Sequence, residues 1–330
     1  MVDQANRTGH SWSVFHIVRL ASGVFLAALA VVTIFANIVL LTTLWNKRKR
    51  PLKSPTMYFI LGLAAADFIT GLIVEPAFSI CYLSSDLSTC RTEVMELIQF
   101  LPRLVINSSF LIVLFLSWSQ FLAIVHPHLY KRVVTKLRVI VLVAIIFVYT
   151  TSFSILQFSR ISKRVLLVID VYLHATFIPF LLMMSYISML LSLRRHMRRR
   201  KAVLFRRNNV IRKDQESEGP VNFLAVPYSV SSECVERQFI QMNLSLTVVL
   251  FICTLPSIVV MHVVLRETYA TLEYQTNLSI AQKVADDVLF IKFALDPFIF
   301  AWNFQKIGQM YKAALLSKNS SPIVTRRSEI

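Results

Sequence analysis

Long apolar stretches alternate with short polar segments along most of this chain. Five of the seven stretches contain no charged residue, residues 54–74 are interrupted only by Asp67, and the last carries several charges. The stretches cover residues 20–46, 54–74, 104–130, 139–159, 171–193, 238–265 and 281–302. A helix needs about 20 residues to cross the hydrocarbon core of a bilayer, and a soluble helix of this length would show a polar stripe. The pattern predicts an all-α membrane protein built as a seven-transmembrane helix bundle.

Positive charge gathers on one side of the predicted membrane. The chain carries 35 Lys and Arg against 18 Asp and Glu, and most of the Lys and Arg lie in the loops after the first, third and fifth stretches and in the tail. Short loops rich in Lys and Arg stay in the cytoplasm. We therefore interpret the charge as orientation rather than as nucleic-acid binding. The amino terminus is then extracellular, the carboxyl terminus is cytoplasmic, and the protein is expected in the plasma membrane.

This orientation divides the chain into three parts. Residues 1–17 form the extracellular amino terminus, and residues 18–303 form the membrane domain. Within that domain the cytoplasmic loop 194–237 contains Gly219, Pro220 and mixed charges, and we expect it to be largely flexible. Residues 304–330 are expected to form a short amphipathic helix on the inner leaflet and a cytoplasmic tail.

Two kinds of covalent modification are expected on the outer side. Asn6 and Asn277 begin glycosylation sequons in predicted outer segments. Cys81 and Cys90 flank the first outer loop, where an oxidising compartment permits a disulfide. The alternative that both thiols are unpaired stays open.

Most of the stretches carry a polar or proline landmark. The landmarks are Asn37, Asp67, the pair His126-Pro127, Pro179, Pro256 and the pair Asp296-Pro297. In this order and at these depths they resemble the rhodopsin-like (class A) family of G-protein-coupled receptors, over about residues 20–316. The resemblance implies an extracellular ligand, a heterotrimeric G protein and arrestin as partners. It implies no cofactor, no metal and no enzymatic activity.

The chain also departs from the family pattern at its cytoplasmic end. Gln120 stands where the family has an arginine that contacts the G protein, although Glu236 keeps the place of its acidic partner. Pro127 follows on the same cytoplasmic face, and Phe300 replaces the tyrosine that closes the last motif. A short second outer loop without cysteine and the Asp-Pro ending resemble the melanocortin and cannabinoid branch, whereas Pro179 departs from it.

Ionisable residues in the outer halves of the stretches are candidates for ligand binding, because such groups are rare inside membrane helices. They are Glu75, Arg103, Asp170, His174, Asp286 and Asp287. Some of them, in the alternative, are solvated near the interface or paired with each other. Pro102 replaces the aspartate that binds amines in aminergic receptors, which argues against a monoamine. A peptide, a lipid with a polar head and a small zwitterion all stay open.

Lys292 is the most unusual residue of the last stretch. In the family, the residues matching Asp67, Ser109, Lys292 and Asp296 surround a sodium ion, and an asparagine is usual at the position of Lys292. Lys292 lies one helical turn before Asp296, so both share one face. We predict that its ammonium group replaces sodium and bridges Asp67 and Asp296, with a proton on one carboxylate completing the charge balance. The alternative is that Lys292 points away from the bundle.

Two other functions remain possible on the sequence alone. The replacements at Gln120 and Phe300 favour a receptor-like protein that does not signal, acting as a decoy or partner receptor. A transporter would also place charges such as Lys292 inside a helical bundle, but it has no reason to reproduce the landmarks.

Overall fold

The computed structural model describes residues 2–46, 55–84, 93–215, 228–266 and 271–319. All regular structure in these ranges is helical, and none of it is strand. The predicted all-α class is therefore confirmed.

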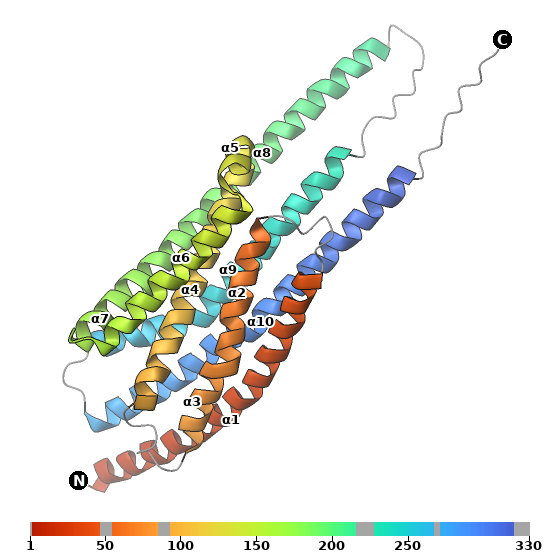
Figure 1. Ribbon diagram of the computed structural model, residues 1–330. Helices are drawn as coiled ribbons and strands as arrows, with labels where there is room; N and C mark the ends of the chain where they lie inside the picture. Colours follow the sequence, from red (N-terminus) through yellow and green to blue (C-terminus); the bar gives the residue numbers. More distant parts are fainter. Residues whose placement is uncertain (1, 47–54, 85–92, 216–227, 267–270, 320–330) are drawn as a thin grey trace, which may run out of the picture.

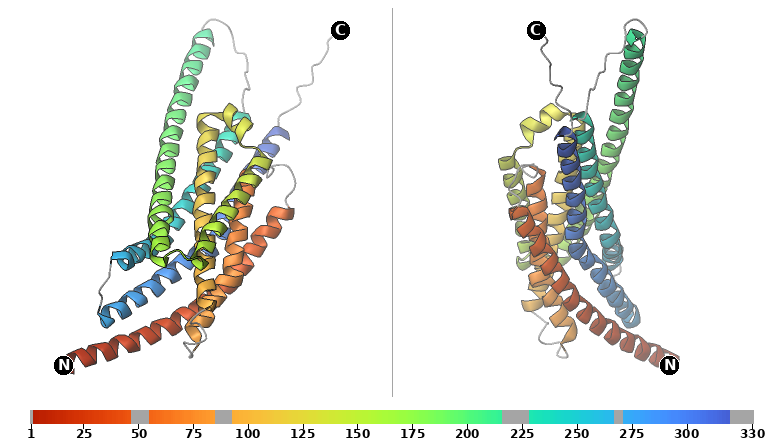
Figure 2. Two further views of the ribbon diagram at one scale, coloured as in Figure 1. Left: turned by 60° about the vertical axis from the view of Figure 1, so that its left-hand side comes forward. Right: turned by 90° about the vertical axis from the view of Figure 1, so that its right-hand side faces the viewer.

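The helices line up as seven long rods (Figure 1). Four rods are single helices, and the other three combine helices with π or 3₁₀ segments. The elements are α1 (Val2–Asn46), α2 (Thr56–Ile69), η2 (Thr70–Val74), α3 (Glu75–Leu83), α4 (Glu93–Val125), α5 (Pro127–Val133), α6 (Lys136–Ile155), η3 (Leu156–Phe158), α7 (Lys163–Ile169), η4 (Asp170–Phe177), α8 (Ile178–Gln215), α9 (Tyr228–Arg266) and α10 (Leu272–Asn319). The rods run roughly side by side, and α8 extends beyond its neighbours at one end (Figure 2).

Helix α4 lies near the middle of the bundle and packs against α2, α6 and α8, whereas α10 packs mainly against α9 and α1. The largest apolar core joins these helices around Phe59, Phe110, Leu116 and Leu246. Helices α1 and α10, the first and the last of the chain, pack against each other. Residues far apart in the sequence therefore form the polar interior.

Six of the rods, in the described residues, are long and apolar enough to cross a membrane. Helix α10 is the rod that is not among them, in keeping with the charges that its sequence contains. Helix α10 is the seventh helix of the bundle because it packs against α9 and α1, and not because of its hydropathy.

The distribution of polarity is that of a membrane protein. Large apolar side chains such as Phe35, Ile145 and Phe180 face outward, while Asn37 and Asp67 are buried in the bundle. Polar groups at membrane depth must find partners inside the protein. The bundle is thus apolar outside and polar at its centre.

Two π-helical segments precede prolines. Segment η2 ends two residues before Pro76, and η4 ends two residues before Pro179. Proline removes a backbone donor and clashes with the carbonyl four residues earlier, and a widened turn relieves both problems. Segment η4 begins with Asp170 and also contains His174, so the widened turn positions part of the candidate site.

Two expectations on the cytoplasmic side need correction. Residues 194–215 continue α8 and residues 228–237 begin α9, so the predicted flexible loop 194–237 is helical over most of its length. Residues 194–215 lack Gly and Pro and are rich in helix-forming Arg and Lys. The expected interfacial helix after the seventh span is helical too, but it continues α10 directly to Asn319, since no Pro or Gly stands in residues 298–307 to turn the chain.

Candidate functional site

A closed charge cluster lies at the centre of the bundle. The Lys292 Nζ atom lies 2.8 Å from an Asp296 carboxylate oxygen and 3.1 Å from an Asp67 oxygen. All three side chains are at most 2% exposed. Lys292 and Asp296 lie one turn apart on α10 and face Asp67 on α2. The predicted contacts of Lys292 are therefore present, and its side chain does not leave the bundle.

The surroundings of this charge cluster are polar on two more helices. Ser109 on α4 is buried, and among the described residues its hydroxyl has no hydrogen-bond partner. Asn37 on α1 donates to the Thr33 carbonyl at 2.9 Å and to the Phe293 carbonyl at 3.2 Å. The second bond ties α1 to α10 one residue after Lys292.

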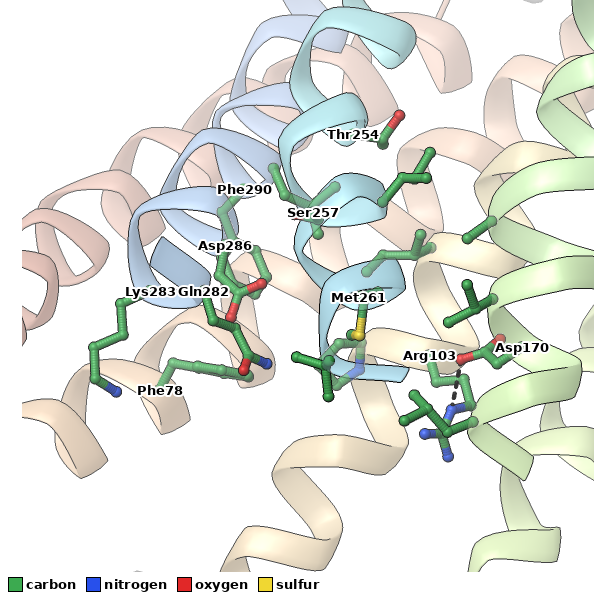
Figure 3. A pocket seen from close by; sticks show the side chains of 18 of the residues that line it. Phe78, Arg103, Asp170, Thr254, Ser257, Met261, Gln282, Lys283, Asp286 and Phe290 are labelled. Carbon is green, nitrogen blue, oxygen red and sulfur yellow. Dashed lines mark hydrogen bonds and ion pairs between the residues drawn. The ribbon is translucent and has the colours of Figure 1, made fainter. Parts of the chain in front are cut away.

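An open cavity of about 710 Å³ lies between the same helices. Its walls come from α1, α3, α4, η3, α7, η4, α9 and α10. Figure 3 shows Ser257 and Met261 of α9 between two charged ends. Arg103 and Asp170 occupy one end, and Lys283 and Asp286 occupy the other. A cavity of this volume suits a drug-sized molecule.

Arg103 and Asp170 form the first charged end. The Arg103 Nε atom donates to an Asp170 carboxylate oxygen at 2.9 Å, and Nη1 donates to the Gln157 side chain at 3.0 Å. Asn107 donates to the other Asp170 oxygen at 3.0 Å. With about a sixth of the Arg103 side chain and a fifth of the Asp170 side chain exposed, this pair borders the cavity and keeps donors available to a ligand.

His174 supports Asp170 from behind. Its Nδ1 lies 3.2 Å from Asp170, and its Nε2 lies 2.9 Å from the Tyr149 hydroxyl. The ring also packs on Phe153, with 4.4 Å between ring centroids. His174 is fully buried and does not line the cavity, so it orients Asp170 and does not contact a ligand directly.

Two other candidates from the sequence lie outside the cavity lining. Glu75 is fully buried and accepts a hydrogen bond from Thr33 on α1 at 3.2 Å. Asp287 accepts a hydrogen bond from Ser22 of α1 at 2.6 Å. Both carboxylates face α1 because α3, which carries Glu75, and α10, which carries Asp287, both pack against that helix. Of the six residues expected to bind ligand, the structure therefore places Arg103, Asp170 and Asp286 in the cavity wall.

Three cations of the cavity wall were not among the candidates predicted from the sequence, and they are Arg19, Lys163 and Lys283. Arg19 precedes the first uncharged stretch, and Lys283 lies at the charged start of the last one. Their signal was present, since both are ionisable residues at the outer edge of an apolar run. The ligand-binding candidates predicted from the sequence included no residue of the first stretch and only the acidic residues of the seventh.

The cytoplasmic half shows what replaces the missing arginine. Gln120 is buried, and its amide has no hydrogen-bond partner among the described residues. One turn earlier, Ser117 accepts a 2.7 Å hydrogen bond from Asn243 of α9, and both residues are fully buried. The side chain of Glu236 lies outside the described residues. Phe300 is buried in the main apolar core.

The remaining candidates are distributed around the bundle. Pro127 is the first residue of the short helix α5. Cys81 is disulfide-bonded, and Cys90, its expected partner, lies outside the described residues. Asn277 is exposed on α10, whereas the side chain of Asn6 is outside the described part. In that part of the chain, no group of three or more His, Cys, Asp or Glu side chains is placed to hold a metal ion.

Comparison with known proteins agrees with this architecture. Residues 36–165 match the family described as 7 transmembrane receptor (rhodopsin family). Over these residues the chain is similar to the rhodopsin-like receptors. The match covers the second, third and fourth rods, and the helices that follow complete the bundle.

Individual receptors are similar to parts of the chain. The histamine H2 receptor of Rattus norvegicus is 29% identical over 155 residues, which are 47% of this chain and 42% of that receptor. The human receptor of the same name is 29% identical over 139 residues, or 42% of this chain and 38% of the receptor. The muscarinic acetylcholine receptor gar-2 of Caenorhabditis elegans is 25% identical over 169 residues, or 50% of this chain and 27% of that receptor. The chain thus matches less than half the length of each relative.

Proposed function

We propose that this rhodopsin-like protein binds an extracellular ligand in the central cavity and transmits the signal to a heterotrimeric G protein and arrestin. The observation that carries the proposal is the position of the cavity beside the buried charge cluster on shared helices. Asp286, Phe290 and Lys292 follow one another along α10. A ligand that moves the outer part of α10 therefore acts on the helix that holds the cluster.

Aromatic packing joins the two sites. Phe290 lines the cavity and contacts Phe78 of α3, with 5.3 Å between ring centroids. Phe290 also packs against Phe293 at 6.0 Å, and the Lys292 ammonium lies 4.5 Å from the Phe293 ring. Packed side chains of this kind respond to displacement by changing between discrete arrangements.

The orientation of the receptor follows from its charge. The Lys- and Arg-rich ends of α8 and α10 belong to the cytoplasmic side, and the cavity then opens toward the outside. This distribution of charge supports a protein of the plasma membrane with its amino terminus extracellular.

The central charge cluster, in this proposal, holds the resting arrangement of α2 and α10. A sodium ion and the Lys292 ammonium cannot occupy the same space between Asp67 and Asp296. Lys292, where the family usually has an asparagine, therefore takes the place of the ion in this proposal. The positive charge is then part of the chain and does not depend on the ionic medium.

A non-signalling receptor is the second candidate, and the burial of Gln120 favours it. An uncharged amide cannot make the charge-assisted contacts of a guanidinium. In that case the cavity would capture a ligand without activating a G protein, as a decoy or partner receptor.

Guanine-nucleotide exchange separates the two candidates. Membranes containing the chain would be mixed with purified G proteins and screened against organic acids, peptides and lipids. Ligand-dependent exchange, absent from membranes without the chain, supports the receptor. Saturable ligand binding without exchange for any G-protein class would support the decoy.

A further inference from the structure

Two cations at the outer end of the cavity form no ion pair with a carboxylate in the described part of the chain. Arg19 on α1 is only 9% exposed, and among the described residues its guanidinium donates one hydrogen bond, from Nη1 to the Ser84 carbonyl at 3.2 Å. Its Nε atom is buried without a hydrogen-bond partner in the described residues. A buried donor atom without a hydrogen-bond partner on a charged group is costly, so this arrangement needs an explanation beyond folding.

Lys283 on α10 belongs to the same corner of the cavity. Its ammonium lies 4.0 Å from the centroid of the Tyr82 ring and 5.5 Å from that of Phe15. Both rings and both cations line the cavity. Arg19 lies one helical turn after Phe15 on α1, so both cations adjoin the same aromatic side chain of the cavity wall, and an anion between them would be attracted to both.

The nearby carboxylates do not satisfy these cations. Asp287 faces α1 and accepts the Ser22 hydrogen bond. Asp286 lies one turn after Lys283, but no ion pair joins these two residues within the described chain. Their side chains point in different directions in Figure 3. This corner contains two cations and two carboxylates, so its formal charges cancel. The two cations nevertheless line the cavity.

We propose that Arg19 and Lys283 form a subsite for the carboxylate group of a small organic acid, whose body packs on Phe15, Phe78 and Tyr82. A guanidinium and an ammonium are the natural partners of a carboxylate. Phe78 packs edge-on against Tyr82 at 5.8 Å between centroids, so the rings form a continuous apolar wall. The subsite rests on the proposal that the cavity binds the ligand, and it names the chemistry of that ligand.

The test uses two probes with one ring system and opposite charge. Indole-3-acetate carries a carboxylate, and tryptamine carries an ammonium group. The thermal unfolding midpoint of the purified full-length protein in detergent would be measured with each probe at millimolar concentration. Binding to the folded state raises the midpoint. Indole-3-acetate is expected to raise it by about 2 °C or more, and tryptamine is not.

Variants locate the effect. Arg19→Met and Lys283→Met are each expected to abolish the shift caused by indole-3-acetate. Arg160→Met, which removes an exposed arginine beyond η3, is expected to retain it. The ligand-free Arg19→Met protein should also unfold at the same temperature as the unmodified protein or a higher one, because residues kept for binding often cost stability.

Three results would overturn the subsite. They are the absence of a shift with indole-3-acetate, a shift that survives both variants, and a ligand-free Arg19→Met protein that unfolds clearly earlier. The test needs no G protein, so its failure is separate from that of the receptor proposal. If carboxylates bind but no nucleotide exchange follows, the subsite is supported and the signalling proposal is contradicted. If only amines drive exchange, signalling is supported and the carboxylate subsite is contradicted.

Discussion

Two ion-paired clusters occupy this bundle, and they differ in what remains for a ligand to do. The inner cluster of Lys292, Asp67 and Asp296 is closed, with the ammonium between two carboxylates and no more than 2% of each side chain exposed. The outer pair of Arg103 and Asp170 is 17% and 19% exposed and lines the cavity. An ionisable residue in a membrane helix is thus a sign of function in both places. Access to the cavity distinguishes a group that binds a ligand from one that holds the helices together.

The largest expected effect follows from opening the inner cluster. Lys292→Met leaves two carboxylates buried without their cation, and breaking a buried ion pair in this way costs about 3–5 kcal/mol. The thermal unfolding midpoint and the yield of folded protein should fall sharply. Lys136→Met, at an exposed lysine, serves as the control.

A compensating variant makes this test specific. Combining Lys292→Met with Asp67→Asn and Asp296→Asn removes the buried charges together and should restore most of the lost stability. If Lys292→Met alone is as stable as the unmodified protein, the inner cluster does not hold the helices together.

The outer pair should respond in binding more than in stability. Arg103→Ala removes a partly solvated partner, while Asp170 keeps Asn107 and His174. We expect a stability loss of about 1 kcal/mol or less and at least a tenfold weaker response to an activating ligand. The half-maximal ligand concentration in nucleotide exchange, measured at matched surface expression, gives the comparison. Arg160→Ala is the control, and equal losses of expression and response would indicate a folding role.

A neutral contact should have an intermediate effect on signalling. Asn243→Leu removes the hydrogen bond to Ser117 that joins α9 to α4, and one such bond contributes about 1 kcal/mol. If it holds the resting arrangement, ligand-independent exchange should rise several-fold. The control is Ser245→Ala. Ser245 lies two residues after Asn243 on α9 and donates to the Gln241 carbonyl of the same helix, so its replacement should leave exchange unchanged. Loss of the Asn243 contact without any change in exchange would assign it to packing alone.

The smallest effect is expected at the cytoplasmic end of α4. Gln120→Arg introduces a guanidinium where the family has one, with Glu236 as the predicted partner. We expect basal or stimulated exchange to change by about two- to threefold, as for a partly exposed ion pair. If neither changes, the missing arginine does not explain the coupling of this receptor.

The sequence predicted the class of the fold and the inner cluster better than the outer site. Lys292 and Asp296 share a helical face by spacing alone, and burial leaves them few partners besides Asp67. The cavity wall depends instead on which side of each helix faces inward, and the π segment at Asp170 and the packing of α1 on α10 decide this. Glu75 and Asp287 therefore faced α1 unexpectedly, and Arg19 reached the cavity. The long helices α8 and α10 also extend farther than loop composition suggested.

Sodium dependence tests the central claim most directly, because it concerns the closed inner cluster without requiring a ligand or a G protein. The unfolding midpoint would be measured in sodium chloride and in N-methyl-D-glucamine chloride at equal ionic strength, for the unmodified protein and for Lys292→Asn. Carboxylates and hydroxyls are the oxygen ligands that hard cations prefer, and Ser109, which the family resemblance assigns to this site, has a buried hydroxyl without a hydrogen-bond partner in the described residues. The unmodified protein should show equal midpoints in both salts, and Lys292→Asn should be stabilised by sodium. A clear sodium-dependent rise in the unmodified protein would contradict the claim that the Lys292 ammonium occupies this site.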